Sequence, residues 1–218
     1  AAAQEPDGYI NTFYTLTGRD KRWTNMDKHE MYCAGHMMEA AVAYYKATGK
    51  RKLLDVSIRM ADHMMDRFGP GKRHWVPGHE EIELALVKLY EVTNREKYLD
   101  FAYWLLEERG HGHGSKGTEG TWNPMYYQDE MPVRELSTIN GHAVRASYLD
   151  CLSVLGILQH LNVIISDQLR ERHLIKPSMQ ADFHVKGRLL PPFQHAIAQA
   201  HRVIDGIFDG LSPVALRQ

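Results

Sequence analysis

Three histidines stand at matching places in the chain, each at or beside the expected start of a helix. They are His29 in Lys-His-Glu-Met-Tyr, His79 in Pro-Gly-His-Glu-Glu and His142 in Asn-Gly-His-Ala-Val-Arg. A neutral imidazole donates one hydrogen bond and accepts another, which suits the hydroxyl groups of a sugar. A single histidine at a helix start is more often a cap or a packing residue, but three in register favour a shared site. We therefore take these three histidines as candidate substrate-binding residues.

Carboxylates cluster beside the histidines, with Arg134 and Arg145 available as partners. The acids are Glu30, Glu80, Glu81, Glu83 and Glu135. An acid in the first turn of a helix stabilises the helix dipole, and this role is sufficient for Glu30, Glu80 and Glu81. A glycosidase needs two carboxyl groups, or one and another nucleophile, across the scissile bond. Glu80 and Glu83 share one helix face and cannot flank a sugar, so we assign no catalytic residue.

A long segment from Gly110 to Asn140 separates two groups of helices. Loops of this length inside a helical array are uncommon and often functional. Its His111-Gly112-His113 offers two metal ligands with no third ligand in the sequence, which is more typical of a solvated loop than of a metal site. We expect no metal-ligating residue here. The aromatic side chains of the loop either stack on a sugar ring or form a local core, namely Trp122, Tyr126 and Tyr127.

The elements that must position these side chains are helices. From about residue 28, apolar residues recur at helical spacing as far as Thr48-Gly49, where the glycine is expected to cap the helix. A second apolar stripe begins near Leu53 and ends at Phe68-Gly69-Pro70. The connection between the two is short, so we expect an antiparallel hairpin.

The hairpin pattern returns further along the chain. Tyr45-x-x-Thr48-x-x-x-x-Leu53-Leu54-Asp55 is echoed by Tyr90-x-x-Thr93-x-x-x-x-Tyr98-Leu99-Asp100, and a third helix is expected to start at Gly141-His142-Ala143. An internal repeat of this length indicates an all-α fold of stacked helical hairpins. Such hairpins form either an open superhelix or a closed α/α barrel, and the period alone does not choose. In a barrel, the starts of the inner helices surround one mouth.

Composition excludes several classes of partner. The 218 residues carry a net charge of -1, which gives no electrostatic basis for binding nucleic acid or an anionic membrane. No apolar stretch reaches the roughly 18 to 20 residues of a membrane-spanning helix. The first residues have no initiator methionine and no signal-peptide pattern, so we expect the numbering to begin inside a longer product and assign no localisation.

The last third of the chain differs from the rest. From Cys151 the repeat is absent, and residues 151–218 contain a single glutamate, Glu171, with neither tryptophan nor tyrosine. Helices are expected around Leu152 to Ile165 and Phe193 to Phe208. We divide the chain into a partial barrel domain, 1–150, and a divergent helical tail, 151–218, for which out-of-frame sequence is one explanation.

Taken in chain order, the motifs of residues 1 to about 150 resemble glycoside hydrolase family 127, the non-reducing-end β-L-arabinofuranosidases. The matching segments are Asp7-Gly8-Tyr9-Ile10-Asn11-Thr12, Arg22-Trp23, His29-Glu30-Met31-Tyr32-x-x-Gly35-His36, Phe68-Gly69-Pro70, Gly78-His79-x-Glu81-Ile82-Glu83, Pro132-Val133-Arg134 and Gly141-His142-Ala143-Val144-Arg145. The resemblance implies helical hairpins that form part of an (α/α)6 barrel, followed in full-length members by β-sandwich domains. The sugar-contacting histidines of the family fall on His29, His79 and His142.

The resemblance also implies a reaction. The family releases terminal β-L-arabinofuranosides from plant glycans with retention, using a glutamate acid/base and a cysteine thiolate that is also a zinc ligand. Its zinc ligands come from a Glu-x-Cys motif and a Cys-Cys pair. After Leu149 this sequence has neither motif, and its two cysteines, Cys33 and Cys151, stand outside any such pattern. We therefore expect no zinc ligands and no turnover from this chain.

Two other hypotheses about the function of the chain stay open at this point. A helical-repeat scaffold would bind a partner protein without catalysis, and a carbohydrate-binding protein would keep the histidines without the reaction. The aligned histidines favour a carbohydrate ligand, an arabinofuranoside, over a scaffold. Because each helical unit buries its apolar stripe against neighbours, a partial barrel is expected to self-associate or aggregate through unpaired helix faces.

Overall fold

The computed structural model describes residues 1–136, 138 and 140–149. Cys151, Glu171 and the helices expected in 151–218 lie outside the described residues. Within the described range no helix is long and apolar enough to cross a membrane.

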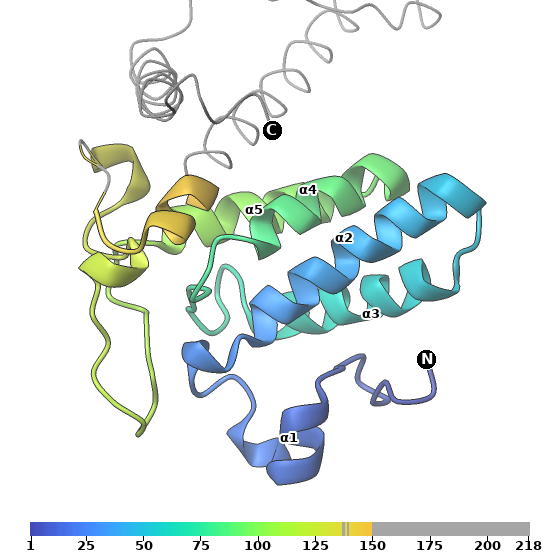
Figure 1. The fold of residues 1–218 in the computed structure, drawn as a ribbon, viewed down its shortest axis with the longest axis horizontal. Coiled ribbons are helices and arrows are strands. Elements are labelled where there is room, and N and C mark those ends of the chain that lie inside the picture. Colours follow the sequence, from blue (N-terminus) through green and yellow to red (C-terminus); the bar gives the residue numbers. More distant parts are fainter. Residues whose placement is uncertain (137, 139, 150–218) are drawn as a thin grey trace, which may run out of the picture. The chain divides into compact units, whose positions relative to one another are not determined.

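The described chain is built from helices joined by loops and short turns (Figure 1). The α-helices are α1 (Thr12–Thr17), α2 (Glu30–Thr48), α3 (Lys52–Arg67), α4 (Ile82–Thr93) and α5 (Glu96–Glu108). Single 3₁₀ turns occur at Arg19–Lys21, Met26–Lys28, Met125–Tyr127 and Val133–Glu135. Residues 143–149 are again helical, which confirms the helix start expected after His142.

Left-handed cap residues end the first helix of each hairpin. Gly49 follows α2 with φ 70°, and Asn94 follows α4 with φ 52°. In both cases the cap N–H donates to the carbonyl four residues back, Tyr45 and Tyr90 respectively. The next helix starts almost at once, so α2–α3 and α4–α5 are hairpins, as the repeat predicts.

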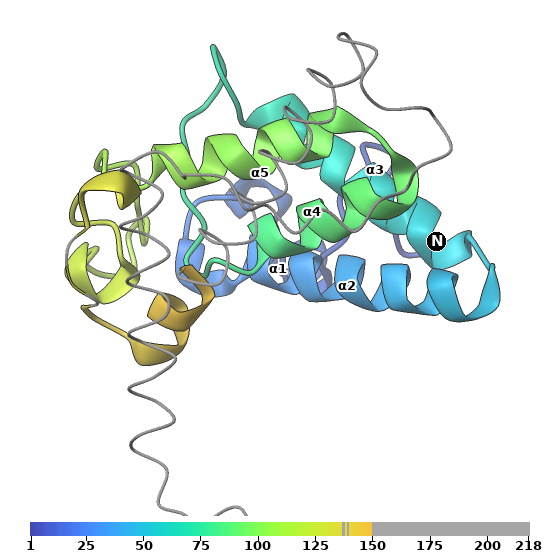
Figure 2. The ribbon, with the colours of Figure 1, turned by 90° about the horizontal axis from the view of Figure 1, so that it is seen from above.

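The two hairpins pack side by side through their first helices. Helix α2 contacts both α3 and α4, and α4 contacts α5. In Figure 2, α3 and α5 lie on the same side of the α2–α4 pair. This is the arrangement of inner and outer helices in an α/α barrel. It puts the starts of α2 and α4 at the same end of the structure.

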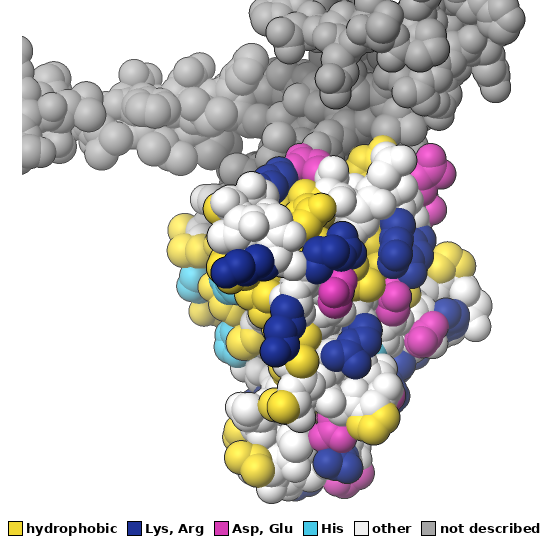
Figure 3. Space-filling model, turned by 90° about the vertical axis from the view of Figure 1, so that its right-hand side faces the viewer, with side chains coloured by type: hydrophobic (Ala, Val, Ile, Leu, Met, Phe, Trp, Pro, Cys, Tyr) yellow, Lys and Arg dark blue, Asp and Glu magenta, His cyan; other side chains and the backbone are white. Residues whose placement is uncertain are grey.

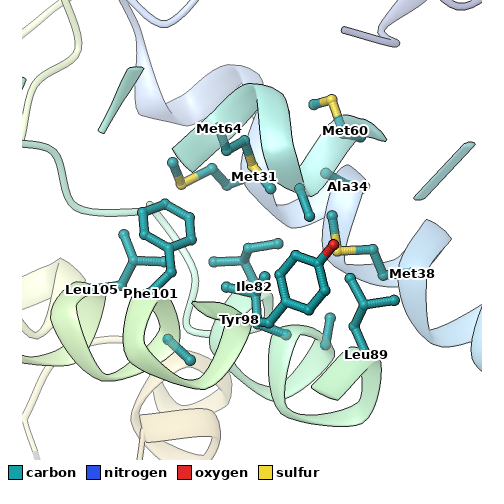
Figure 4. Close-up of a cluster of buried hydrophobic side chains, with 14 of the residues drawn as sticks. Met31, Ala34, Met38, Met60, Met64, Ile82, Leu89, Tyr98, Phe101 and Leu105 are labelled. Carbon is teal, nitrogen blue, oxygen red and sulfur yellow. The ribbon is translucent and has the colours of Figure 1, made fainter. Parts of the chain in front are cut away.

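A single apolar core joins the four long helices (Figure 4). Methionines supply much of it, and Met38, Met60 and Met64 are fully buried. The opposite hairpin contributes Ile82, Leu89, Tyr98, Phe101 and Leu105. Unbranched methionine side chains adapt to irregular gaps between helices. Burial of this core fixes the helices, and therefore the loops at their ends.

Charged residues cover the outside in mixed signs. Figure 3 shows lysine and arginine side chains lying among aspartate and glutamate on one face. Lys46 on α2 pairs with Glu91 on α4 at 3.0 Å, and Lys97 on α5 pairs with Asp62 on α3 at 2.6 Å. Exposed pairs of this kind contribute little stability, roughly 0–1 kcal/mol each. The fold therefore depends mainly on its core.

Helix α2 approaches the start of α4 closely at Gly35. A Cβ atom at this position would lie 2.9 Å from Glu81 Cγ and 3.2 Å from the backbone Cα of Ile82. The first distance is shorter than normal contact, and the Ile82 backbone has little freedom to move. Gly35 thus allows the two helix starts, and the histidines beside them, to come together.

Substituting Gly35→Ala is expected to destabilise the fold by about 1–3 kcal/mol, because overpacking separates α2 from α4. Helix propensity alone predicts the opposite sign, a gain of roughly 0.5–1 kcal/mol. Urea unfolding followed by circular dichroism measures the difference. Ala43→Gly, at an exposed position of the same helix, calibrates the propensity contribution. A Gly35→Ala protein more stable than the original would show that the close approach is unimportant.

Candidate functional site

The three candidate histidines converge at one end of the helical hairpins. The ring centroids of His29 and His79 are 5.0 Å apart, and those of His79 and His142 are 6.5 Å apart. All three side chains are partly exposed. Tyr32, in the first turn of α2, has its ring centroid 4.6 Å from that of His79 and extends the group. We call His29, His79 and His142 the histidine cluster.

His29 is held in an unusual backbone conformation. It caps α2 with φ 60° and ψ 28°, in the left-handed region. Its N–H donates to the Met26 carbonyl at 3.1 Å, and its carbonyl accepts from Cys33 N–H at 2.8 Å. A non-glycine residue in this region costs on the order of 1–3 kcal/mol, and such strain concentrates at functional sites. Trp23, Asn94 and Gln128 also have positive φ, so for His29 the conformation marks the start of α2 and does not by itself indicate function.

Glu30 anchors the segment that precedes the histidine. Its carboxylate is buried and accepts hydrogen bonds from Tyr9 Oη at 2.5 Å and Trp23 N–H at 2.7 Å. Burial raises the pKa of Glu30 to about 7, and the two hydrogen bonds act in the opposite direction. Glu30 therefore does more than complement the helix dipole, because it fixes the N-terminal segment against α2.

His79 is kept neutral by its surroundings. Burial, then the nearby positive charge of Arg145, lower the pKa of His79 to about 3. Arg145 itself is buried and lies over the Tyr127 ring, with Cζ 4.2 Å from the ring centroid. A neutral imidazole offers one donor and one acceptor, as a sugar hydroxyl requires.

Glu80 and Glu83 surround a buried arginine rather than a ligand. Both carboxylates are fully buried, as is Arg109 at the end of α5. An Arg109 guanidinium nitrogen lies 3.0 Å from Glu80 Oε1, and another lies 3.9 Å from Glu83 Oε1. Glu80 lies in the turn before α4 and Glu83 in its first turn, so the two acids do not share one helix face as expected from the sequence, but both carboxylates are turned toward Arg109. Their place in the interior excludes them as a catalytic pair.

The N–H groups of Arg109 are directed elsewhere. They donate to the carbonyls of Tyr127 at 2.8 Å and Pro77 at 3.0 Å. In the described part of the chain, no donor from another residue is aligned with the carboxylate oxygens of Glu80 or Glu83. Burial consequently raises the pKa of Glu80 to about 8 and that of Glu83 to about 7, although Arg109 opposes both shifts. The two acids share one positive charge, so burial keeps a proton on one of them.

Asp129 organises the long loop. Its two oxygens accept from Gly110 N–H at 2.7 Å and Trp122 Nε1 at 2.8 Å. Trp122 stacks on Tyr127 with ring centroids 3.9 Å apart. Trp122 and Tyr127 therefore form a local core of the loop. This was one of the two interpretations that the sequence left open for its aromatic side chains, the other being stacking on a sugar ring.

The long loop contacts the surroundings of the histidine cluster at two places, beside His29 and beside His142. Tyr127 Oη donates to Asp27 at 2.5 Å, just before His29, while the half-exposed Tyr126 ring lies 5.4 Å from the His142 ring. Gly141, with φ 77°, passes so close to the Met125 carbonyl that a Cβ would lie 2.1 Å from its oxygen. The loop thus positions His142, and Tyr126 is its exposed aromatic ring beside the cluster.

The remaining acids and the first cysteine have other surroundings. Glu135 is exposed, and Arg134 pairs with Glu107 at 2.8 Å. Cys33 is exposed, and no group of three potential metal ligands among the described residues includes a cysteine. With two cysteines in the whole sequence, the donor set does not fit a thiolate zinc centre.

Comparison with known proteins identifies the family. A family model described as β-L-arabinofuranosidase, GH127 catalytic domain, matches residues 1–173. The chain belongs to glycoside hydrolase family 127. This confirms the resemblance inferred from the motifs. The family match runs past residue 150, where those motifs end, and the domain boundary at that position stays a prediction.

Relatives of the family 127 chain are much longer. It is 39% identical over 188 residues to a non-reducing end β-L-arabinofuranosidase of Bifidobacterium longum subsp. longum, a match that covers 77% of this chain and 28% of that protein. The family 127 chain therefore spans little more than a quarter of the length of that relative.

Solved structures agree with the fold. A GH127 β-L-arabinofuranosidase from Geobacillus stearothermophilus T6 matches with a TM-score of 0.65 and 45% identity, over 69% of this chain and 26% of that one. A second GH127 β-arabinofuranosidase matches with a TM-score of 0.61 and 39% identity, over 72% and 26% of the two chains. The described part of the family 127 chain is all-α, as the repeat predicts, and its helical hairpins form part of an (α/α)6 barrel, as the family resemblance implies.

Proposed function

We propose that the chain is part of a glycosidase that releases a terminal β-L-arabinofuranosyl residue from plant glycans, and that the histidine cluster binds the hydroxyls of this residue. The observation that carries the proposal is the convergence of His29, His79 and His142 from three separate segments. Membership of family 127 and the arabinofuranosidase names of its relatives support the substrate class. Neither a scaffold nor a binding-only role has an observation in its favour.

The physical chemistry of the cluster suits such a ligand. His79 is neutral at ordinary pH, so it donates to one hydroxyl and accepts from another. Tyr126 and Tyr32 present ring surfaces beside the histidines, against which the C–H groups of a furanose pack. The ligand we propose is a carbohydrate; with a net charge of -1, we expect neither nucleic acid nor a membrane surface as a partner.

We further propose that this chain alone does not turn over substrate. Its residues include no Glu-x-Cys and no Cys-Cys pair, so no zinc centre of the family type is available. A cysteine reacts as a thiolate, and partial burial of the Cys33 thiol raises its pKa, which disfavours that form. Residues 1–150 then act as the sugar-binding part of a barrel, 151–218 as a divergent tail, and unpaired helix faces favour self-association.

Binding and turnover are tested separately. We expect an aryl β-L-arabinofuranoside to perturb the histidine ring signals of the purified chain in NMR, without release of the aryl group. His79→Ala is expected to weaken binding by about tenfold, the equivalent of one lost hydrogen bond. His111→Ala, on the loop outside the cluster, is the matched control. Hydrolysis by the chain would refute the proposed inactivity, whereas equal binding by both variants would refute the role of the cluster.

A further inference from the structure

A second group of imidazoles lies outside the histidine cluster. His74 comes from the connection between α3 and α4, Glu108 from the last residue of α5, and His113 from the long loop. The Nδ1 atoms of His74 and His113 lie 2.8 Å and 2.7 Å from the same carboxylate oxygen, Glu108 Oε2. The two imidazole centroids are 4.7 Å apart. Three separate segments therefore direct nitrogen and oxygen ligands toward one point.

We propose that His74, Glu108 and His113 bind a divalent transition-metal ion, and that zinc fits them best. Two imidazoles and one carboxylate are an established ligand set for zinc, with the fourth position left to water or a substrate group. In the sequence, His113 stands two residues after His111 and has no third ligand nearby. In the structure, His74 and Glu108 come from other segments and lie beside His113.

The distances suit a small cation. One potential ligand atom from each of the three side chains lies within 4.8 Å of the other two. Zinc bound at about 2.0–2.2 Å to each ligand in tetrahedral geometry separates the ligand atoms by about 3.3 Å. The observed nitrogen–oxygen distances of 2.8 and 2.7 Å are about 0.5–0.6 Å shorter than that separation. To hold the ion, the three ligand atoms would have to move apart by about that difference.

The hydrogen-bond pattern also points to a cation. His113 Nδ1 is buried and close to Glu108 Oε2, yet it is not aligned for a hydrogen bond within the described residues. His74 Nδ1 already makes a hydrogen bond with that oxygen. An ion between the three groups would use the lone pairs of both imidazoles and would neutralise Glu108. Among the residues that the structure describes, the ion pairs of this carboxylate involve the two histidines and no lysine or arginine.

A second group of potential metal ligands is a weaker candidate for a metal site. His36, Glu39 and Glu81 also lie close together. The Lys88 ammonium already contacts Glu39. Burial and the neighbouring Glu39 raise the pKa of Glu81 to about 8, so a proton competes for its oxygens. This group has its own cations and carries no proposal.

The test uses the 218-residue chain, prepared without a histidine tag, stripped with a chelator and titrated with Zn²⁺ at pH 7.5 in a calorimeter. We expect His74→Ala and His113→Ala each to weaken the tightest binding step at least about tenfold, the loss that follows removal of a ligand or its support. His111→Ala is the matched control, since it removes a neighbouring histidine of the same loop. Because every other histidine is unchanged between variants, zinc bound elsewhere cancels in the comparison.

The spectrum of Co²⁺ provides the second measurement. Cobalt in a tetrahedral site of this ligand set absorbs in the visible range, and we expect His74→Ala to abolish that band. His74 is half exposed, so this substitution leaves the core intact. Zinc binding that is the same in the original chain and in His74→Ala and His113→Ala would overturn the proposal. So would a loss in His111→Ala and His113→Ala with none in His74→Ala, which would assign the ion to the His111–His113 pair.

Discussion

Arg109→Met is expected to destabilise the folded chain by about 3–5 kcal/mol, the cost of removing one partner from a buried charge group. The methionine fills much of the arginine volume but donates no hydrogen bond. The carbonyls of Tyr127 and Pro77 then lose their donors. Glu80 and Glu83 lose the positive charge that both share. Urea unfolding followed by tryptophan fluorescence and by circular dichroism measures the change.

Arg134→Met is the matched control for the buried arginine. Arg134 pairs with Glu107 at a similar distance, 2.8 Å, but both side chains are roughly half exposed. Its loss is expected to cost no more than about 1 kcal/mol. Adding Glu80→Gln to Arg109→Met is expected to recover part of the stability, because one buried acid is removed. If both arginine variants lose the same small amount, the buried group is not what holds the long loop to α4.

Local sequence signals were sufficient to predict the helices. Apolar periodicity gave α2 and α3, and the stop at Thr48-Gly49 is confirmed by the left-handed conformation of Gly49. The repeat predicted the second hairpin, because equivalent residues at equal spacing must bury equivalent faces. The histidines could be grouped for the same reason. Each stands beside the start of an element of the same kind, so a barrel-like stack brings them together.

Contacts between distant segments were not predictable from local patterns. Arg109 carried no signal in the sequence, because its partners Glu80 and Glu83 lie near the start of the preceding helix of the hairpin and pair with it only after α5 folds back. Glu30 was interpreted as a dipole partner, whereas it also accepts hydrogen bonds from Tyr9 and Trp23.

The long loop illustrates the same difficulty. Trp122 and Tyr127 suit a sugar platform and a small core equally well in sequence, and stacking against each other settles their role. His111 and His113 appear as a pair of neighbours in the sequence. In the folded chain, His113 instead joins His74 and Glu108. Spacing of ligands along a chain identifies a metal site only when all of them lie within one or two segments.

The stability of the chain is expected to fall as the pH rises from about 5 to about 8. Burial raises the pKa of Glu80 to about 8 and that of Glu83 to about 7. The folded state therefore holds more protons than the unfolded state above the ordinary pKa of glutamate, and stability decreases with pH in that window. Each pKa unit corresponds to about 1.4 kcal/mol, so we expect a loss of at least about 2 kcal/mol.

Glu80→Gln isolates this effect, because glutamine keeps the shape of the protonated acid and does not titrate. We expect the variant to gain stability relative to the original chain as the pH rises, by at least about 1 kcal/mol between pH 5 and pH 8. His79 acts in the opposite direction, since its lowered pKa makes stability rise from about pH 3 to about pH 6.5. It is present in both proteins and cancels in their difference. Glu107→Gln, at a half-exposed position, is the matched control and should show no such trend. Parallel stability curves for Glu80→Gln and the original chain would mean that Glu80 is ionised in the folded interior, with Arg109 alone sufficient to hold its charge.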